Sequence, residues 1–167
     1  MMNQLRLRCS SLIAESILFG LIVSAHAAQT SGPIIIHGQN GTVFSGLNIS
    51  STTGDCVTIS KSANITIQNS QIGPCSTNNS HTNSRGIYIK GSTRINIFDS
   101  YIHVENLACC CCDTHDGVLV DGSIYVLVQG NVIAYGESNI QIGLAPSDHV
   151  FVIGNFLLNP RGPYPRG

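Results

Sequence analysis

Three charged residues occupy the same place in successive copies of a repeated segment, directly before an apolar stretch. They are Asp55, Arg85 and Asp116. If the copies stack, acid, base and acid lie one above another, with the carboxylates two repeats apart. Two carboxylates around a cation can bind a metal ion or a sugar, or act as general acid and base. An alternating charge ladder also avoids stacking like charges at a turn, so both interpretations stay open.

The acidic segment at 113–116 adds a second candidate group. It contains Asp113, His115 and Asp116, and Asp121 follows shortly after. Oxygen-rich clusters suit Ca²⁺ or Mg²⁺, so Asp113, Asp116 and Asp121 are candidate metal ligands. Their spacing is that of neither an EF-hand loop nor a zinc-binding helix, and a solvated polar loop is the alternative. The candidate catalytic residues are Asp55, Arg85, His115 and Asp116.

Six cysteines follow the first 27 residues, an even number that fits disulfides in an oxidising compartment. They are Cys56, Cys75, Cys109, Cys110, Cys111 and Cys112. One hypothesis pairs Cys75 with the run Cys109 to Cys112, because both lie in insertions of neighbouring repeats; Cys56 with Cys75 is the competing pair. Four consecutive cysteines do not easily surround one Zn²⁺, whose ligands are usually separated by two or more residues.

The elements that must position these groups are short strands in a repeat of about 23 residues. The copies lie at 56–72, 86–102, 117–133 and 140–157, with a weaker one at 34–49. Apolar and polar residues alternate within each copy, which predicts strands. A fixed repeat of strands predicts a solenoid of stacked rungs instead of a domain with one closed core.

Alignment of the copies predicts what each position does. Three aliphatic columns should fill a narrow core, with rungs about 4.8 Å apart. They are Val57, Ile87, Val118 and Ile140, then Ile65, Ile95, Val126 and Val150, then Ile72, Ile102, Ile133 and Leu157. Before the third column come turn residues that tolerate positive φ, and then small polar residues that can hydrogen-bond along the stack. These two sets are Asn69, Asp99, Gly130 and Gly154, and Ser70, Ser100, Asn131 and Asn155.

Two copies carry insertions, at 73–85 and 103–116. Because they occupy the same turn of neighbouring repeats, we expect them to project side by side. Repeat proteins often place their sites on such loops. The insertions therefore lie where Arg85 and Asp116 would act.

These columns and turns resemble the right-handed parallel β-helix superfamily, which includes pectate lyases and polygalacturonase-like glycosidases. The resemblance covers residues 32–160 and implies an all-β, right-handed parallel β-helix of about five rungs of three short strands. The segments 53–57 and 72–74 resemble the double-aspartate rung of polygalacturonase-type hydrolases, but Cys56 stands in place of the second Asp. No Gly-His-Gly follows Pro74 and no Arg-Ile-Lys appears downstream. Neither a hydrolase nor a pectate-lyase mechanism can be transferred residue by residue.

The resemblance also implies a class of function. We expect a carbohydrate-related protein, a polysaccharide lyase or hydrolase of unknown substrate; Ca²⁺ is the cofactor expected of a lyase. The alternative is a non-catalytic surface, structural or polysaccharide-binding β-helix. The enzyme interpretation gains if Asp55, Arg85 and Asp116 line an open groove beside the second insertion, and it fails if they are packed over or splayed apart.

Residues 1–27 are predicted to be a secretory signal. Arg6 and Arg8 form its charged start, residues 17–23 its short apolar core, and the Ala-His-Ala at 25–27 its cleavage site. The apolar run is too short to cross about 30 Å of hydrocarbon, so we do not expect an integral membrane protein. The expected location is secreted or periplasmic.

Charge and the end of the chain give two further expectations. A net charge of −1 gives no electrostatic basis for binding nucleic acid. Solenoids need covered ends. The Pro- and Gly-rich residues 161–167 are therefore expected to be a tail over the last rung or the start of a missing C-terminal part.

Overall fold

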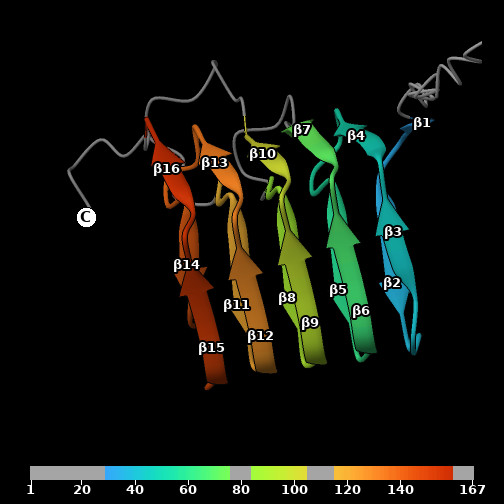
Figure 1. Cartoon of the computed structure of the whole chain (residues 1–167), viewed down its shortest axis with the longest axis vertical. Coiled ribbons are helices and arrows are strands. Elements are labelled where there is room, and N and C mark those ends of the chain that lie inside the picture. Colours follow the sequence, from blue (N-terminus) through green and yellow to red (C-terminus); the bar gives the residue numbers. More distant parts are fainter. Residues whose placement is uncertain (1–28, 76–83, 105–114, 160–167) are drawn as a thin grey trace, which may run out of the picture.

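The computed structural model describes residues 29–75, 84–104 and 115–159, and all regular elements in these ranges are strands (Figure 1). The strands are β1 (Gln29–Ser31), β2 (Ile34–His37), β3 (Val43–Ser45), β4 (Leu47–Ser51), β5 (Val57–Ser60), β6 (Ala63–Gln68), β7 (Gln71–Cys75), β8 (Ile87–Lys90), β9 (Thr93–Phe98), β10 (Tyr101–His103), β11 (Val118–Asp121), β12 (Ile124–Gln129), β13 (Val132–Ala134), β14 (Ile140–Ile142), β15 (Asp148–Ile153) and β16 (Phe156–Leu158). The signal, the tail and the tips of both insertions lie outside the described residues.

The strands form three parallel sheets that the chain visits in turn. Sheet A has the order β1-β4-β7-β10-β13-β16, sheet B β14-β11-β8-β5-β2, and sheet C β15-β12-β9-β6-β3. Each rung passes from sheet B through sheet C to sheet A, so strands of one sheet lie side by side along the stack (Figure 1). The prediction of about five rungs of three strands is confirmed, and the weaker copy at 34–49 forms the rung of β2, β3 and β4.

The predicted aliphatic columns are paired as the alignment requires. In sheet C, Ile97 lies between Ile67 and Val128, and in sheet A, Ile102 lies between Ile72 and Ile133. All six side chains are at most 1% exposed. In the last described rung the same columns are open, because no further described rung lies against them: Ile142, Val152 and Leu157 are 50, 42 and 50% exposed.

The turn between sheets C and A uses both predicted sets of residues. Asn69 and Asp99 have φ of 48° and 44°, and Gly130 and Gly154 have φ of 70° and 62°. Next to them, the backbone N–H of each small polar residue donates to the side-chain oxygen of the next rung: Ser70 to Ser100 at 3.1 Å, Ser100 to Asn131 at 3.0 Å and Asn131 to Asn155 at 2.9 Å. The ladder satisfies amides that the solenoid buries at each turn.

A second ladder, which the alignment did not single out, holds the turn between sheets B and C. The N–H of Ser62 donates to Ser92 Oγ at 3.2 Å, that of Ser92 to Ser123 at 3.1 Å, and that of Ser123 to Ser147 at 3.2 Å. Two of the three turns of each rung are thus held by side chains that accept from the neighbouring rung.

Asn131 offers a direct test of the first ladder. It is fully buried, and its Nδ2 donates to the carbonyl oxygens of Ile97 and Gln129 at 2.9 and 3.0 Å. Asn131→Ala would leave the Ser100 N–H unpaired and would remove the amide donor to both carbonyls, and we expect it to lower the free energy of unfolding by about 2 kcal/mol. Asn131→Ser should lose much less, because serine fills this position in two other rungs. Urea denaturation measures both losses, and an equal loss of unfolding free energy in Asn131→Ala and Asn131→Ser would contradict this role.

Candidate functional site

Backbone hydrogen bonds join the segments that precede the sheet B strands in neighbouring rungs. The N–H of Cys56 donates to the Arg85 carbonyl at 2.9 Å, and those of Gly86 and Val118 donate to the carbonyls of Asp116 and Asn139 at 3.0 Å each. The predicted column of Asp55, Arg85 and Asp116 therefore forms at the edge where both insertions leave the solenoid. Ser138 continues the column in the next rung, where Asn139 lies opposite Gly117.

Glycines allow the rungs to approach closely beside this column. A Cβ on Gly86 would lie 2.4 Å from the Gly117 carbonyl oxygen, and one on Gly117 equally close to the Asn139 carbonyl oxygen. Each glycine follows a site residue, Arg85 or Asp116. A larger residue at either position would push the neighbouring rungs apart and so separate Arg85 from Asp116.

Asp55 and Arg85 form a two-point ion pair. Arg85 Nε donates to Asp55 Oδ1 at 2.9 Å, and Arg85 Nη2 donates to Asp55 Oδ2 at 3.0 Å. The Arg85 backbone N–H also donates to Asp55 Oδ1, at 2.9 Å. The guanidinium also stacks on Tyr88, with Cζ 3.8 Å from the ring centroid. Arg85 is thus committed to two neighbours, which favours a positioning role over that of a free base.

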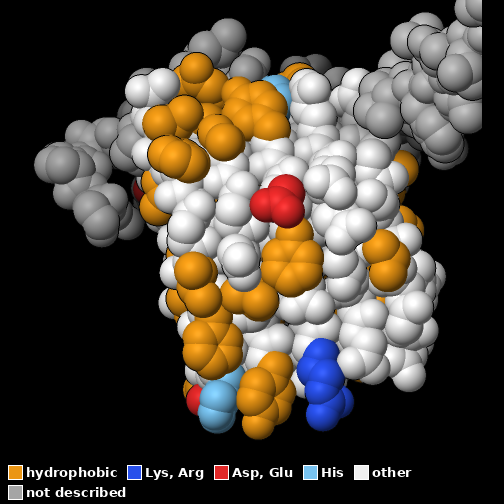
Figure 2. All heavy atoms as spheres, viewed as in Figure 1, with side chains coloured by type: hydrophobic (Ala, Val, Ile, Leu, Met, Phe, Trp, Pro, Cys, Tyr) orange, Lys and Arg blue, Asp and Glu red, His pale blue; other side chains and the backbone are white. Residues whose placement is uncertain are grey.

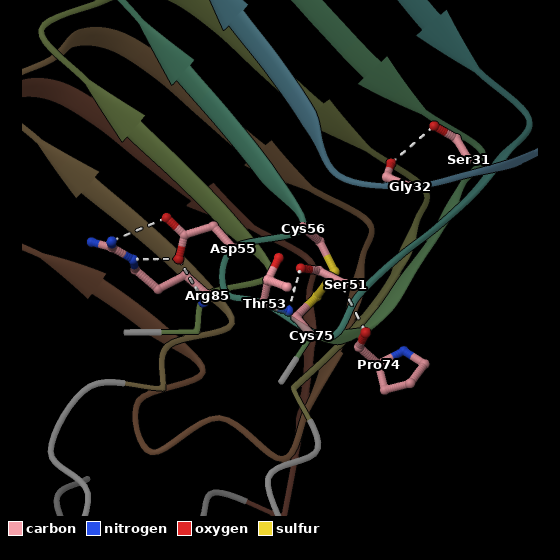
Figure 3. The surroundings of a disulfide bond; sticks show 9 residues. All are labelled: Ser31, Gly32, Ser51, Thr53, Asp55, Cys56, Pro74, Cys75 and Arg85. Atoms are coloured by element: carbon pink, nitrogen blue, oxygen red, sulfur yellow. Dashed lines mark hydrogen bonds and ion pairs between the residues drawn. A yellow bond between two sulfur atoms is a disulfide. The ribbon is translucent and has the colours of Figure 1, made fainter. Parts of the chain in front are cut away.

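The disulfide joins Cys56 to Cys75, with Cα atoms 5.4 Å apart, within the rung of β5 to β7. The hypothesis that paired Cys75 with the second insertion is therefore wrong: the chain returns at the end of β7 to the start of β5, which brings Cys75 beside Cys56. Figure 3 shows the bridge directly beside the Asp55–Arg85 pair. The run from Cys109 to Cys112 lies outside the described residues.

Asp116 lies beside a second buried carboxylate. Asp116 is 5% exposed and Glu137, which follows β13, is 7% exposed. Burial first, and then the charge of Glu137, raise the pKa of Asp116 from 3.8 to about 6, against the opposing effects of Arg85 and of hydrogen bonds from Ser138. In the amide orientation that satisfies both groups, Gln141 donates to the two Asp116 oxygens at 3.2 and 2.9 Å. Asp116 thus titrates close to neutral pH.

His115 precedes Asp116 and is also buried. Burial lowers its pKa, and a hydrogen bond with the Ser84 backbone opposes that effect. The imidazole is therefore neutral at pH 7. The His115 carbonyl accepts from the Glu137 N–H at 2.6 Å, which ties the loop of Glu137 to this edge.

The candidate metal ligands are not brought together in the described part of the chain. Asp121 lies at the opposite end of β11 from Asp116, about 16 Å along an extended strand. Its carboxylate accepts from Tyr88 Oη at 2.9 Å and from the Ala145 N–H at 2.7 Å. Asp113 lies outside the described residues, among which no three His, Cys, Asp or Glu side chains are grouped as a metal site requires. Asp116 and Asp121 do not fit one Ca²⁺, and no step is assigned to a metal.

Sequence reasoning missed two residues of this edge, Glu137 and Gln141, and it did not connect the outward-facing Tyr88 with Arg85. Glu137 lies in the short loop before Asn139, outside every repeat column, and only its proximity to an aligned position could have indicated it. Gln141 and Tyr88 occupy outward positions of sheet B strands, where side chains vary between rungs. Their roles follow from contacts between neighbouring rungs.

Comparison with known proteins bears on the fold. Neither protein-family models nor curated protein sequences match this chain. Among solved structures, the A-module of a mannuronan C-5 epimerase from Azotobacter vinelandii matches 82% of this chain with a TM-score of 0.50 and 16% sequence identity. Together with three parallel sheets in register, this match decides the architecture. The chain is a right-handed parallel β-helix.

This β-helix spans 43% of the length of the epimerase module, and at 16% identity the likeness extends to the fold alone. No helix in the described part of the chain is long and apolar enough to span a membrane.

Proposed function

We propose that this β-helix is an exported protein that acts on a polysaccharide, with Asp116 as its proton-transfer group. The observation that carries the proposal is a buried carboxylate whose pKa is raised to about 6, held beside Glu137 at the edge where the insertions emerge. Perturbed carboxylates of this kind are typical of general acids and bases.

A groove on sheet B supports the proposal. It has a volume of about 550 Å³ and is lined by Tyr88, Lys90, Asp121, Leu144 and neighbouring small residues. Tyr88 connects this groove with the candidate site, because the Arg85 guanidinium stacks on the Tyr88 ring and the Tyr88 hydroxyl donates to Asp121. A sugar chain could stack on the Tyr88 ring, and Lys90 could then bind an acidic group of that sugar.

Export and substrate class have separate support. The predicted signal at 1–27 and the Cys56–Cys75 disulfide both favour an oxidising compartment outside the cytoplasm. Mannuronan, the polysaccharide after which the structurally similar epimerase is named, is a natural first substrate to test.

The second candidate is a non-catalytic polysaccharide-binding β-helix. Two observations favour it: Arg85 is occupied by Asp55 and Tyr88, and Asp116 is almost fully buried. Asp55, Arg85 and Asp116 are also largely packed over, which is the outcome that counts against the enzyme interpretation of the charge ladder. Activity therefore decides between the candidates.

The experiment is a degradation screen of purified protein on mannuronan, pectic and glycosaminoglycan substrates, following unsaturated products and reducing ends. We expect activity, and we expect Asp116→Asn to lower it by about 10²- to 10⁴-fold, as loss of a general acid or base does. A rate that rises with pH through about 6 marks Asp116 as a base, because the ionised form reacts; a falling rate marks it as an acid. Inactive, well-folded wild-type protein would favour the non-catalytic candidate.

A further inference from the structure

We propose that the outer face of sheet C carries a separate binding site for an acidic sugar segment, centred on Arg94 and Tyr125. A groove of about 480 Å³ lies on this face. It is lined by Asn64, Thr66, Arg94, Asn96, Tyr125, Leu127 and Phe151. None of these residues belongs to the edge around Asp116, so the inference stands whether or not that edge is catalytic.

Two columns of outward side chains form the groove, as the strand register shows. Thr66 pairs with Asn96, Asn96 with Leu127, and Leu127 with Phe151. The other column, on the same strands, contains Asn64, Arg94 and Tyr125. The groove therefore crosses strands β6 to β15 along the solenoid axis, about 14 Å at the usual strand spacing. That length suits a short oligosaccharide.

The second column stands on an unusual backbone. Asn64, Arg94, Tyr125 and His149 have φ of 54°, 54°, 58° and 52°. Asparagine tolerates this conformation, whereas arginine, tyrosine and histidine adopt it at a cost. Each of these rungs thus has one residue with positive φ at the same place on the sheet. In neighbouring rungs this residue is Arg94 and Tyr125, so a cation and an aromatic ring lie side by side along the stack.

The side chains suit an acidic sugar. The guanidinium of Arg94 is exposed and makes no ion pair or hydrogen bond with any residue that the structure describes, so it is free to bind a carboxylate at two points. Tyr125 and Phe151 are 48 and 49% exposed and offer ring faces for the apolar side of a sugar. Asn96 lies beside Leu127 in the same groove and can hydrogen-bond to sugar hydroxyl groups.

The charge of the groove lining also favours an anion. No carboxylate lines the groove. The nearest in register, Asp148, is paired with His149 at 2.8 Å, and the His149 ring lies 4.7 Å from that of Tyr125. Figure 2 shows this face, with a basic side chain in blue next to hydrophobic ones in orange at the lower rim. A flat groove of rings and amides around one cation fits a sugar acid better than an acidic peptide, which would present a denser charge.

The test uses Arg94→Asn and Tyr125→Asn, because asparagine suits a positive φ and neither change should disturb folding. Lys61→Asn is the matched control: Lys61 is an exposed cation with φ of 47° that lies outside the groove. The probes are an oligogalacturonate, its methyl ester and poly-glutamate. Affinity is followed through the amide resonances of β9 and β12, the strands that carry Arg94 and Tyr125.

We expect the oligogalacturonate to bind, Arg94→Asn to weaken it about ten-fold and leave the ester unaffected, and Tyr125→Asn to weaken both. Lys61→Asn and Asp116→Asn should bind as the wild type does, which separates this site from the proposed active site. Absence of binding, equal loss with Lys61→Asn, or poly-glutamate binding as tightly as the sugar would overturn the proposal.

Discussion

Protein carrying Ile97→Asp is expected not to fold. Ile97 is fully buried in the centre of sheet C, between Ile67 and Val128 of the neighbouring rungs. Aspartate there would have no cation within the aliphatic column. A lone buried charge costs several kcal/mol, which is comparable to the whole stability of a domain, about 5–15 kcal/mol. Circular dichroism and limited proteolysis would measure the loss.

Asn96→Asp is the matched control, because residue 96 precedes Ile97 on β9 and points to the opposite face. The same charge should be tolerated there, and Thr66→Asp on β6 should be tolerated for the same reason. Soluble, protease-resistant Ile97→Asp protein would contradict the register of sheet C.

Asp116→Asn is expected to make the protein more stable at neutral pH. The folded state raises the pKa of Asp116 from 3.8 to about 6, so it retains a proton that the unfolded chain releases. Stability therefore falls as pH rises from about 4 to about 6, by at most about 3 kcal/mol. Asparagine carries no charge and avoids this loss. The variant should be up to about 3 kcal/mol more stable than wild type at pH 8, with the smallest advantage at pH 4.

Urea denaturation at a series of pH values measures this difference. Asp99→Asn is the control, because Asp99 is exposed at the turn between sheets C and A and its φ of 44° suits asparagine. A constant difference between Asp116→Asn and wild type at all pH values would contradict the burial of an ionisable Asp116.

Most of the solenoid could be predicted because each rung repeats the same physical requirements. An inward position such as Ile97 must be aliphatic in every copy, and a turn such as that at Asn69 must tolerate positive φ, so alignment alone shows the register. The column of Asp55, Arg85 and Asp116 was predictable for the same reason.

The chemistry of the candidate site was less predictable because it depends on residues that do not repeat. Glu137 reaches Asp116 from a loop that belongs to no column, and Tyr88 occupies an outward position that differs in every rung. The disulfide could not be predicted from the alignment alone, because the pairing of Cys75 with Cys56 depends on where the end of β7 lies in space. The backbone conformation at Arg94 was missed because arginine gives no sequence signal for positive φ.

The central claim is that the insertion edge holds a buried carboxylate ready to transfer a proton near neutral pH. The most direct measurement is an NMR titration of the Asp116 side-chain carboxyl, assigned by its loss in Asp116→Asn. The account predicts a midpoint at pH of about 6. A midpoint near 3.8, the ordinary value for an aspartate, would contradict it.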